Sequence, residues 1–174
     1  MIPMTETKSA ERASTSLLER IARRALVLTT HMIHEANHRP DKELGDPKVG
    51  GHPASCASSL HIMTALHLVV RKPFDTICGK PHVAPLDHTF NYMLGLMRRP
   101  DGTWMSDEEA EVAMHNLRHY SWTHEPTLQS YHATSDPDHQ NYLPSGSVGI
   151  PPVNSAYLAL AYKFAHARGH EVPE

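Results

Sequence analysis

Residues 48–68, KVGGHPASCASSLHIMTALHL, join a glycine-containing loop to an apolar segment and set the expectations for the fold. The pattern predicts a buried helix over residues 54–70, small at its front end and bulky at its back end. A helix N-terminus carries free N–H groups and a partial positive charge, both of which favour a phosphate group. We therefore expect an anion-binding loop here, with His52 and Ser55 as additional donors.

Two further loops have a similar composition. Residues 79–85, GKPHVAP, follow a short strand expected over residues 74–83, and ligands of open α/β sheets lie outside the carboxyl ends of strands. Residues 144–149, PSGSVG, precede another expected helix and offer hydroxyls and exposed amides. Three such loops in one small chain, two of them with a histidine, indicate a shared ligand that bears phosphate.

The rest of the chain is expected to be mostly helical. A capping box at Ser16–Glu19 opens a helix that should end near Asn37, since Pro40 disfavours a helical residue before it. Residues 1–13 are polar and form a flexible N-terminus in this interpretation. The other expected elements are a helix starting at Asp87, a helix from a second capping box at Ser106 to about residue 118, a long loop over 120–152 and a helix over 153–167.

Composition excludes several classes of protein. The 174 residues carry a formal charge of -3, which argues against a nucleic-acid footprint. No run of apolar residues approaches the roughly 18 that cross a membrane, and the N-terminus lacks an apolar signal core. Two cysteines make no disulfide framework, so we expect a cytoplasmic protein.

Fifteen histidines are the unusual feature of the composition, and imidazole suits proton chemistry, metal binding or anion contacts. His115 and His119, like His34 and His38, have the i, i+4 spacing that can hold a metal ion on a helix. No third ligand is arranged beside either pair, so surface histidines are favoured and no metal ligand is predicted. Cys56 and Cys78 lack CxxC spacing and are interpreted as small thiols rather than nucleophiles. No Gly-x-Ser-x-Gly motif supports a serine hydrolase.

Taken together, the three loops resemble a known family. KVGGHPASCASSLHIMTALHL resembles the first block of transketolase-like thiamine-diphosphate enzymes, closest to the homodimeric pyruvate dehydrogenase first component with its Gly-His-x-Ala-Ser-x-x-Ser-Ser pattern. GKPHVAP resembles the family's His-x-Ser-Pro segment, with Ala84 in place of the serine. SYHATSDPDHQNYLPSGSVG resembles its Ser-Tyr…Pro-x-x-Ser-Met-Gly-Leu-Gly-Pro stretch. The blocks occur in family order, and the resemblance covers roughly residues 44–170.

The resemblance implies a fold, a cofactor and a set of site residues. The fold would be α/β, with residues 14–174 forming a helix-dominated, partial thiamine-diphosphate-binding domain whose sheet is incomplete. The chain would be the N-terminal portion of a transketolase or 2-oxo acid dehydrogenase-type enzyme, a transferase or oxidoreductase acting on a small keto substrate. The implied catalytic residues are His52, His82 and Tyr131, and the implied cofactor-binding residues are Ser55, His82, Ser147, Val148 and Gly149.

Departures from the family pattern keep two alternatives open. Pro151 and Leu86 stand where the pattern has glycine, and the sequence contains no Gly-Asp-Gly, the motif that holds Mg²⁺ against the cofactor diphosphate in the family. We therefore expect a homo-oligomer or a complementary chain that carries that motif, together with an exposed hydrophobic sheet edge or helix face on this chain. The alternatives are a non-catalytic binding or assembly module derived from the family and an unrelated histidine-rich helical domain.

Overall fold

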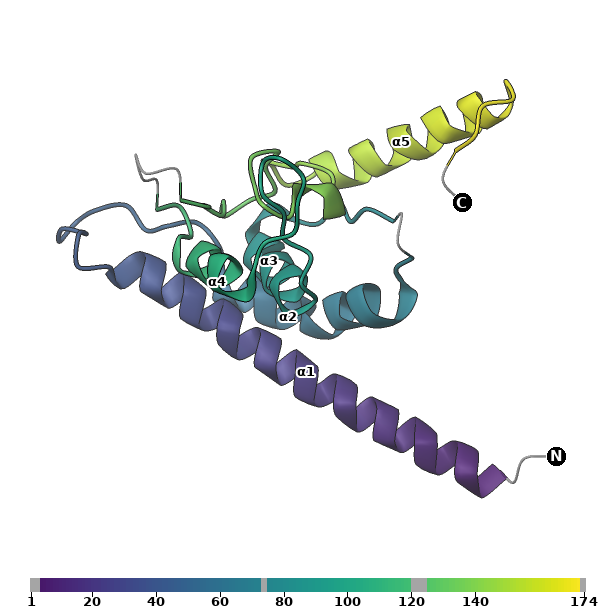
Figure 1. The fold of residues 1–174 in the computed structure, drawn as a ribbon, viewed down its shortest axis with the longest axis horizontal. Helices are drawn as coiled ribbons and strands as arrows, with labels where there is room; N and C mark the ends of the chain where they lie inside the picture. The colour runs from purple at the N-terminus through teal and green to yellow at the C-terminus, as the bar shows by residue number, and fades with distance from the viewer. Residues whose placement is uncertain (1–3, 73–74, 120–124, 173–174) are drawn as a thin grey trace.

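Helices dominate the computed structural model, which describes residues 4–72, 75–119 and 125–172 (Figure 1). Over these residues there are five α-helices, short 3-10 and π-helical turns, and no β-strand beyond isolated bridges. The α/β architecture is therefore not shown, and the part of the chain that is described is all-helical. The elements in order are α1 (Met4–His38), α2 (Pro53–Ala65), η1 (Leu66–Val70), η2 (Pro81–Val83), α3 (Ala84–Met93), α4 (Asp107–His115), η3 (His139–Asn141) and α5 (Ile150–His166).

Helix α1 is the central packing element of the fold, because α2, α3 and α4 all pack along its second half. Small side chains make this close packing possible: Ala22, Ala25 and Ala36 are buried on the face turned to the body. The helix ends at His38, which confirms the expected end near Asn37. The expected start is wrong, since α1 already begins at Met4 and the proposed capping box lies inside it. Residues 4–13 belong to the same helix, and residues 1–3 lie outside the described part.

Helix α2 and η1 form one continuous helical segment over residues 53–70, one residue longer than the expected range of 54–70. By length and composition this segment is apolar enough to cross a membrane, with a mean hydropathy of 1.3 over 18 residues, so the expectation that no run approaches that length is wrong. It nevertheless places Cys56, Leu60 and Met63 in the common core with α1 and α3. Its other face carries the exposed Ile62, so the helix is half-buried rather than enclosed.

The strand expected over residues 74–83 is wrong for the part that is described. Residues 75–80 are irregular, with one bridge from Ile77 to Tyr142, and residues 81–83 form the 3-10 turn η2. Pro81 has no N–H to donate to a sheet ladder, which favours the turn. Phe74, the expected first residue of that strand, lies outside the described residues. Helix α3 then begins at Ala84, three residues before the expected cap, so Asp87 lies in its first turn and points into the core.

Helix α4 begins at a capping box: the Ser106 hydroxyl accepts from the Glu109 amide, and the Glu109 carboxylate accepts from the Ser106 amide. This confirms the second capping box, although the helix ends at His115 rather than near residue 118. The long loop expected over 120–152 is irregular over its described residues 125–149, apart from η3. Residues 120–124 lie outside the described part.

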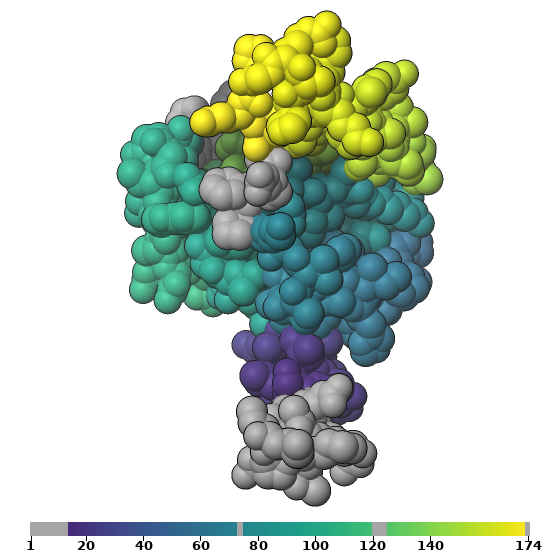
Figure 2. Space-filling model, turned by 90° about the vertical axis from the view of Figure 1, so that its right-hand side faces the viewer, coloured from purple at the N-terminus to yellow at the C-terminus, as the bar shows by residue number. Residues whose placement is uncertain are grey.

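Helix α5 projects away from the helical body (Figure 1), and in Figure 2 its yellow-green to yellow residues lie at the top of the molecule. It follows Gly149, whose φ of 96° lies in the left-handed region that favours glycine. Pro151 is its one buried residue among those described, whereas most of its large apolar side chains are exposed. The exposed large apolar residues of α5 are Ile150, Val153, Tyr157, Leu160, Tyr162 and Phe164.

Candidate functional site

His52 and His82 come together where the loop before α2 meets η2. His52 is the N-cap residue of α2, and its backbone N–H donates to the His82 carbonyl at 3.3 Å. The two imidazole rings lie 6.2 Å apart between centroids and are both exposed. They line one open cavity of about 780 Å³, which also contains Gly50 and Gly51. The structure thus brings the histidines of the first two loops to one surface.

The residue that precedes Tyr131 in the chain, Ser130, contacts the same loop. Gly50 packs so closely against Ser130 that a Cβ at position 50 would overlap the Ser130 hydroxyl. Ser130 is buried, whereas the Tyr131 side chain is 37% exposed and sits at the surface. The contact therefore brings the segment around Ser130 next to the first loop, although Tyr131 does not line the cavity of His52 and His82.

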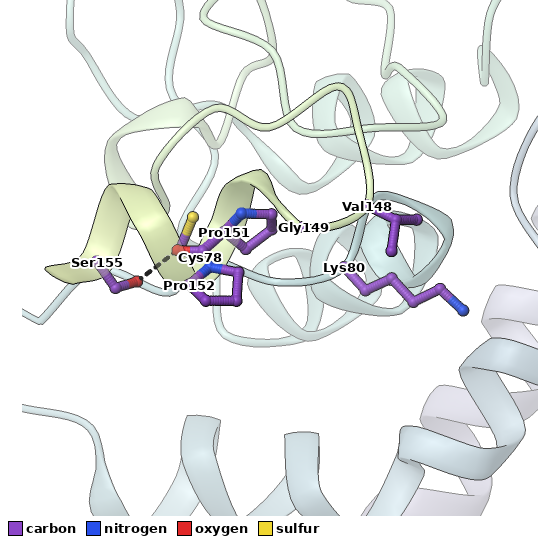
Figure 3. A pocket seen from close by; sticks show the side chains of 7 residues that line it. All are labelled: Cys78, Lys80, Val148, Gly149, Pro151, Pro152 and Ser155. Carbon is purple, nitrogen blue, oxygen red and sulfur yellow. Dashed lines mark hydrogen bonds between the residues drawn. The ribbon is translucent and has the colours of Figure 1, made fainter. Parts of the chain in front are cut away.

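The third loop contacts the second one directly. His132 and Ser145 form an antiparallel bridge, and the Ser145 hydroxyl donates to the Gly79 carbonyl at 3.1 Å. Val148 and Gly149 then share a cavity of about 340 Å³ with Lys80 (Figure 3). All three loops are thus joined through contacts between their backbones and short side chains.

Figure 3 shows how the second cavity is built. Pro151 and Pro152 lie at one end with Cys78, and the Lys80 side chain extends away from them. Pro151 and Pro152 have no amide N–H, so the first turn of α5 offers fewer donors to an anion than a helix start normally does.

Ser55 and Ser147, like Tyr131, are less central than His52, His82, Val148 and Gly149. Neither belongs to the lining of the two cavities that contain His52, His82, Val148 and Gly149. Ser55 is half-buried in the first turn of α2, and its carbonyl accepts from the Ser58 hydroxyl at 3.0 Å. Ser147 is exposed just before Val148.

The two cavities are rich in donors. No side chain caps the first turn of α2, and the one α2 residue in the lining of the first cavity is Pro53, which has no amide N–H. His52, His82 and Lys80 add side-chain donors at the rim. The far side of the first cavity is mixed in charge, with Lys42 and Lys48 next to Glu43 and Asp46. These donors favour an anionic ligand, but they are divided between two cavities that share no lining residue: His52 and His82 line one, and Lys80, Val148 and Gly149 line the other.

The cysteines near these loops are not poised for nucleophilic chemistry. Burial raises the pKa of the Cys56 thiol to about 11, and Cys56 Sγ lies 3.6 Å from the His82 carbonyl oxygen. Burial also raises the pKa of Cys78. A thiol must ionise to attack, so both groups stay in the unreactive form at neutral pH.

A buried histidine–aspartate network behind the loops is the main feature that sequence reasoning missed. The Asp87 carboxylate lies 2.9 Å from His67 Nε2 and 2.8 Å from His132 Nε2, and all three side chains are buried. Burial alone would raise the pKa of Asp87, but the hydrogen bonds from His132 and His67 outweigh it and hold the pKa well below its usual range. The position of Asp87 also explains why residue 79 is a glycine, because a Cβ at Gly79 would lie 3.1 Å from Asp87 Oδ2.

The second half of the network surrounds His88. Its Nδ1 donates to Asp138 at 2.9 Å, and its Nε2 donates to the Gln129 carbonyl at 2.9 Å. Burial would lower the pKa of His88, but the charge and hydrogen bond of Asp138 raise it to about 9. The Tyr142 hydroxyl lies 2.8 Å from both Asp136 and Asp138, so the network ties the loop over residues 129–142 to α3.

His88, Asp136 and Asp138 have the residue types and spacing of a metal site, with ligand atoms within 4.8 Å of one another. Hydrogen bonds already engage these atoms, however. Both imidazole nitrogens of His88 have acceptors, and an imidazole that donates through both nitrogens has no lone pair for a metal. The geometry therefore fits a protonated His88 neutralising Asp138.

Comparisons with family models, curated proteins and solved structures find no match to this chain. The function therefore has to be argued from the loops and the chemistry of their side chains.

Proposed function

We propose that this chain forms the diphosphate- and keto-substrate-binding part of a thiamine-diphosphate-dependent enzyme of the transketolase or pyruvate dehydrogenase type. The observation that supports the proposal is the convergence of three loops that are far apart in the sequence. His52 contacts His82, Gly50 contacts Ser130 next to Tyr131, and Lys80 shares a cavity with Val148 and Gly149. The three resembling motifs lie in these loops.

The donor set fits an anionic ligand. In this proposal His52, His82 and the free amides of α2 bind the diphosphate, assisted by Ser55, and the backbone at Ser147, Val148 and Gly149 contacts the opposite end of the cofactor. His52, His82 and Tyr131 also donate to the oxygen of the keto substrate as it becomes negative. The bound cofactor would supply the carbon–carbon bond chemistry, with the substrate's acceptor deciding between oxidoreductase and transferase activity.

Magnesium is the part of the cofactor that these residues fit least well. Mg²⁺ requires oxygen ligands, whereas the three loops present imidazoles, an amine and prolines, and the carboxylates of the first cavity, Glu43 and Asp46, come from a preceding segment next to Lys42 and Lys48. We therefore propose that the metal ligands and the parallel strands of an α/β domain come from a second chain with a Gly-Asp-Gly motif, or from further copies in a homo-oligomer. The exposed apolar residues of α5 support such an assembly, because monomers rarely expose so many on one helix.

A non-catalytic binding or assembly module is the second candidate. Pro151, which lacks the amide N–H that a glycine would offer beside the cavity, favours it. Both candidates act on small molecules or proteins rather than on nucleic acid or membranes. A cytoplasmic location suits both, since Cys56 and Cys78 are free thiols.

Calorimetric titration of the chain with thiamine diphosphate, with and without Mg²⁺, tests the first candidate. We expect measurable binding, weaker binding of thiamine, which lacks the diphosphate, and a loss of about tenfold in affinity in His52→Ala and His82→Ala, equivalent to one charge-assisted hydrogen bond. His61→Ala is the matched control, because His61 is exposed on α2 away from the loops. Equal affinity for thiamine and thiamine diphosphate would contradict the proposed diphosphate site.

A native pull-down separates the two candidates. Co-purification with a chain that contains Gly-Asp-Gly, together with activity on a 2-oxo acid or ketose phosphate when Mg²⁺ and cofactor are added, supports the enzyme. Stable self-association without cofactor affinity supports the assembly module.

A further inference from the structure

The junction between α1 and α4 gathers four side chains that can bind a metal ion. α1 presents His31 and Glu35 one helical turn apart, and α4 presents Glu111 and His115 with the same spacing. Residues at i and i+4 lie on one face of a helix. The two helices contact each other, and all four side chains line one small cavity of about 60 Å³ at the junction.

Two of these side chains, His31 and His115, converge on one carboxylate oxygen of a third, Glu35. His115 Nδ1 lies 2.7 Å from Glu35 Oε2, and His31 Nδ1 lies 3.3 Å from the same oxygen. The two imidazole rings are 6.3 Å apart between centroids and almost perpendicular, at 82°. Nitrogen atoms from two different helices thus approach a shared carboxylate from different directions.

Hydrogen bonds alone explain this cluster poorly. An exposed histidine–carboxylate pair contributes little stability, and here two histidines compete for one oxygen. Zn²⁺ binds imidazole nitrogen at about 2.0–2.1 Å and carboxylate oxygen at about 2.0–2.2 Å, which puts a nitrogen and an oxygen ligand at separations close to the two N···O distances at Glu35. The ligand atoms of all three side chains do not lie within 4.8 Å of one another as they stand, so a histidine side chain must turn for both imidazoles to reach one ion. All three side chains are at least one-third exposed, so their χ angles can adjust and an ion can reach them from solvent.

We propose that His31, Glu35 and His115 bind a divalent transition-metal ion, with Glu111 or water as the fourth ligand. Two imidazoles and a carboxylate fit Zn²⁺ and related ions rather than Mg²⁺ or Ca²⁺, which prefer oxygen ligands alone. The ion links α1 to α4 and holds the two helices together. This site is independent of the cofactor-binding loops, since none of its residues lines either loop cavity.

The structure also shows why the histidine pairs favoured by spacing alone are poorer candidates. His34 and His38 stack face to face with centroids 4.0 Å apart, and His38 Nδ1 is engaged by the His34 carbonyl at 2.7 Å. His119 points to Asp41, 3.5 Å away, while its i–4 neighbour His115 points to Glu35. The spacing of a single helix therefore selects the wrong partners, because the ligands come from two helices.

Titration of the chelator-treated full chain with Co²⁺, followed by displacement with Zn²⁺, tests the site. We expect the visible absorption of four- or five-coordinate Co²⁺ to saturate at one equivalent and to disappear on addition of Zn²⁺.

Variants at the three ligands locate the ion. Glu35→Gln and His115→Gln should each lower the affinity by about tenfold or more, whereas His38→Gln, on the same helix as Glu35, should leave it unchanged. Circular dichroism confirms that each variant is folded, and His31→Gln provides a third variant if one fails to fold. Absence of saturable binding in the parent chain, or equal losses in His38→Gln and Glu35→Gln, would overturn the proposal.

Discussion

His88 donates a hydrogen bond through Nδ1 to Asp138 Oδ2 at 2.9 Å, and both side chains are completely buried. Replacement of His88 by glutamine would leave the Asp138 carboxylate buried without its cation. Breaking a buried pair in this way costs about 3–5 kcal/mol. We therefore expect a large fall in the urea midpoint at pH 7, measured by circular dichroism. His61→Gln, at an exposed position, should change the free energy of unfolding by less than about 0.5 kcal/mol.

The same pair predicts a loss of stability in alkali. The pKa of His88 is raised from 6.5 to about 9, so its contribution to stability is fully present below pH 6.5 and disappears as pH rises through 9. Unfolding free energies measured from pH 6 to pH 10 should fall over this window in the parent chain. The curve for His88→Gln should be flatter there; parallel curves for the two proteins would contradict a protonated His88.

Gly79 is required by the close approach of the backbone to the Asp87–His132 pair. A Cβ at this position would lie 3.1 Å from Asp87 Oδ2 and 3.2 Å from His132 Cε1. Gly79→Ala should therefore lower the free energy of unfolding by about 1–3 kcal/mol, as overpacking in a core does. Gly146→Ala is the matched control, because an added Cβ there meets open space and the φ angle is ordinary. Equal stability of the two variants would show that the Gly79 segment can move away from the pair.

The capping box of α4 gives a smaller, local prediction. Ser106→Ala removes the hydroxyl that accepts from the Glu109 amide at 3.3 Å. Loss of an N-cap side chain costs about 1 kcal/mol, and thermal unfolding should register this as a lower Tm. Ser58→Ala serves as a comparison, since the Ser58 hydroxyl is exposed on α2 and only contacts the Ser55 carbonyl. A Tm as high as that of Ser58→Ala would show that the cap contributes nothing.

The exposed apolar side chains of α5 predict association. Tyr157→Ser combined with Leu160→Ser should shift sedimentation profiles toward the 19.4 kDa monomer, because the two side chains are 69% and 60% exposed in the single chain. The helix content should stay the same. A monomer in both the parent chain and the double variant would argue against a homo-oligomer held together by this face.

Sequence patterns predicted the helices well where a strong local signal was present. Ser106 and Glu109 form the predicted capping box, and Pro40 follows the end of α1 closely. The start of α1 was mispredicted because Ser16 and Glu19 have the capping pattern but also tolerate the middle of a helix. The strand prediction was wrong because a short apolar run fits a buried turn as well as a strand. Pro81 favours the turn, which begins at that residue.

The candidate site, like the fold, could be predicted from the sequence only in part. Loops with glycine and histidine could be singled out from residues 50–52 and 79–82, and the structure joins them through His52 and His82. The buried network was missed because its members lie in different segments: Asp136 and Asp138 look like ordinary loop carboxylates until His88 is placed beside them. Contacts between residues this far apart in the sequence leave no periodic signal in it.

The buried network also constrains the order in which parts of the chain can fold during synthesis. The His88 partner Asp138 is 50 residues further along, and the second partner of Asp87, His132, is 45 residues further along. A ribosome adds about 5–20 residues per second, so α3 emerges seconds before the residues that complete its surroundings. Until then Asp87 and His88 lack these partners, so we expect both side chains to stay hydrated and α3 to pack loosely. Chains truncated just before residue 138 should therefore be more sensitive to protease than the full chain.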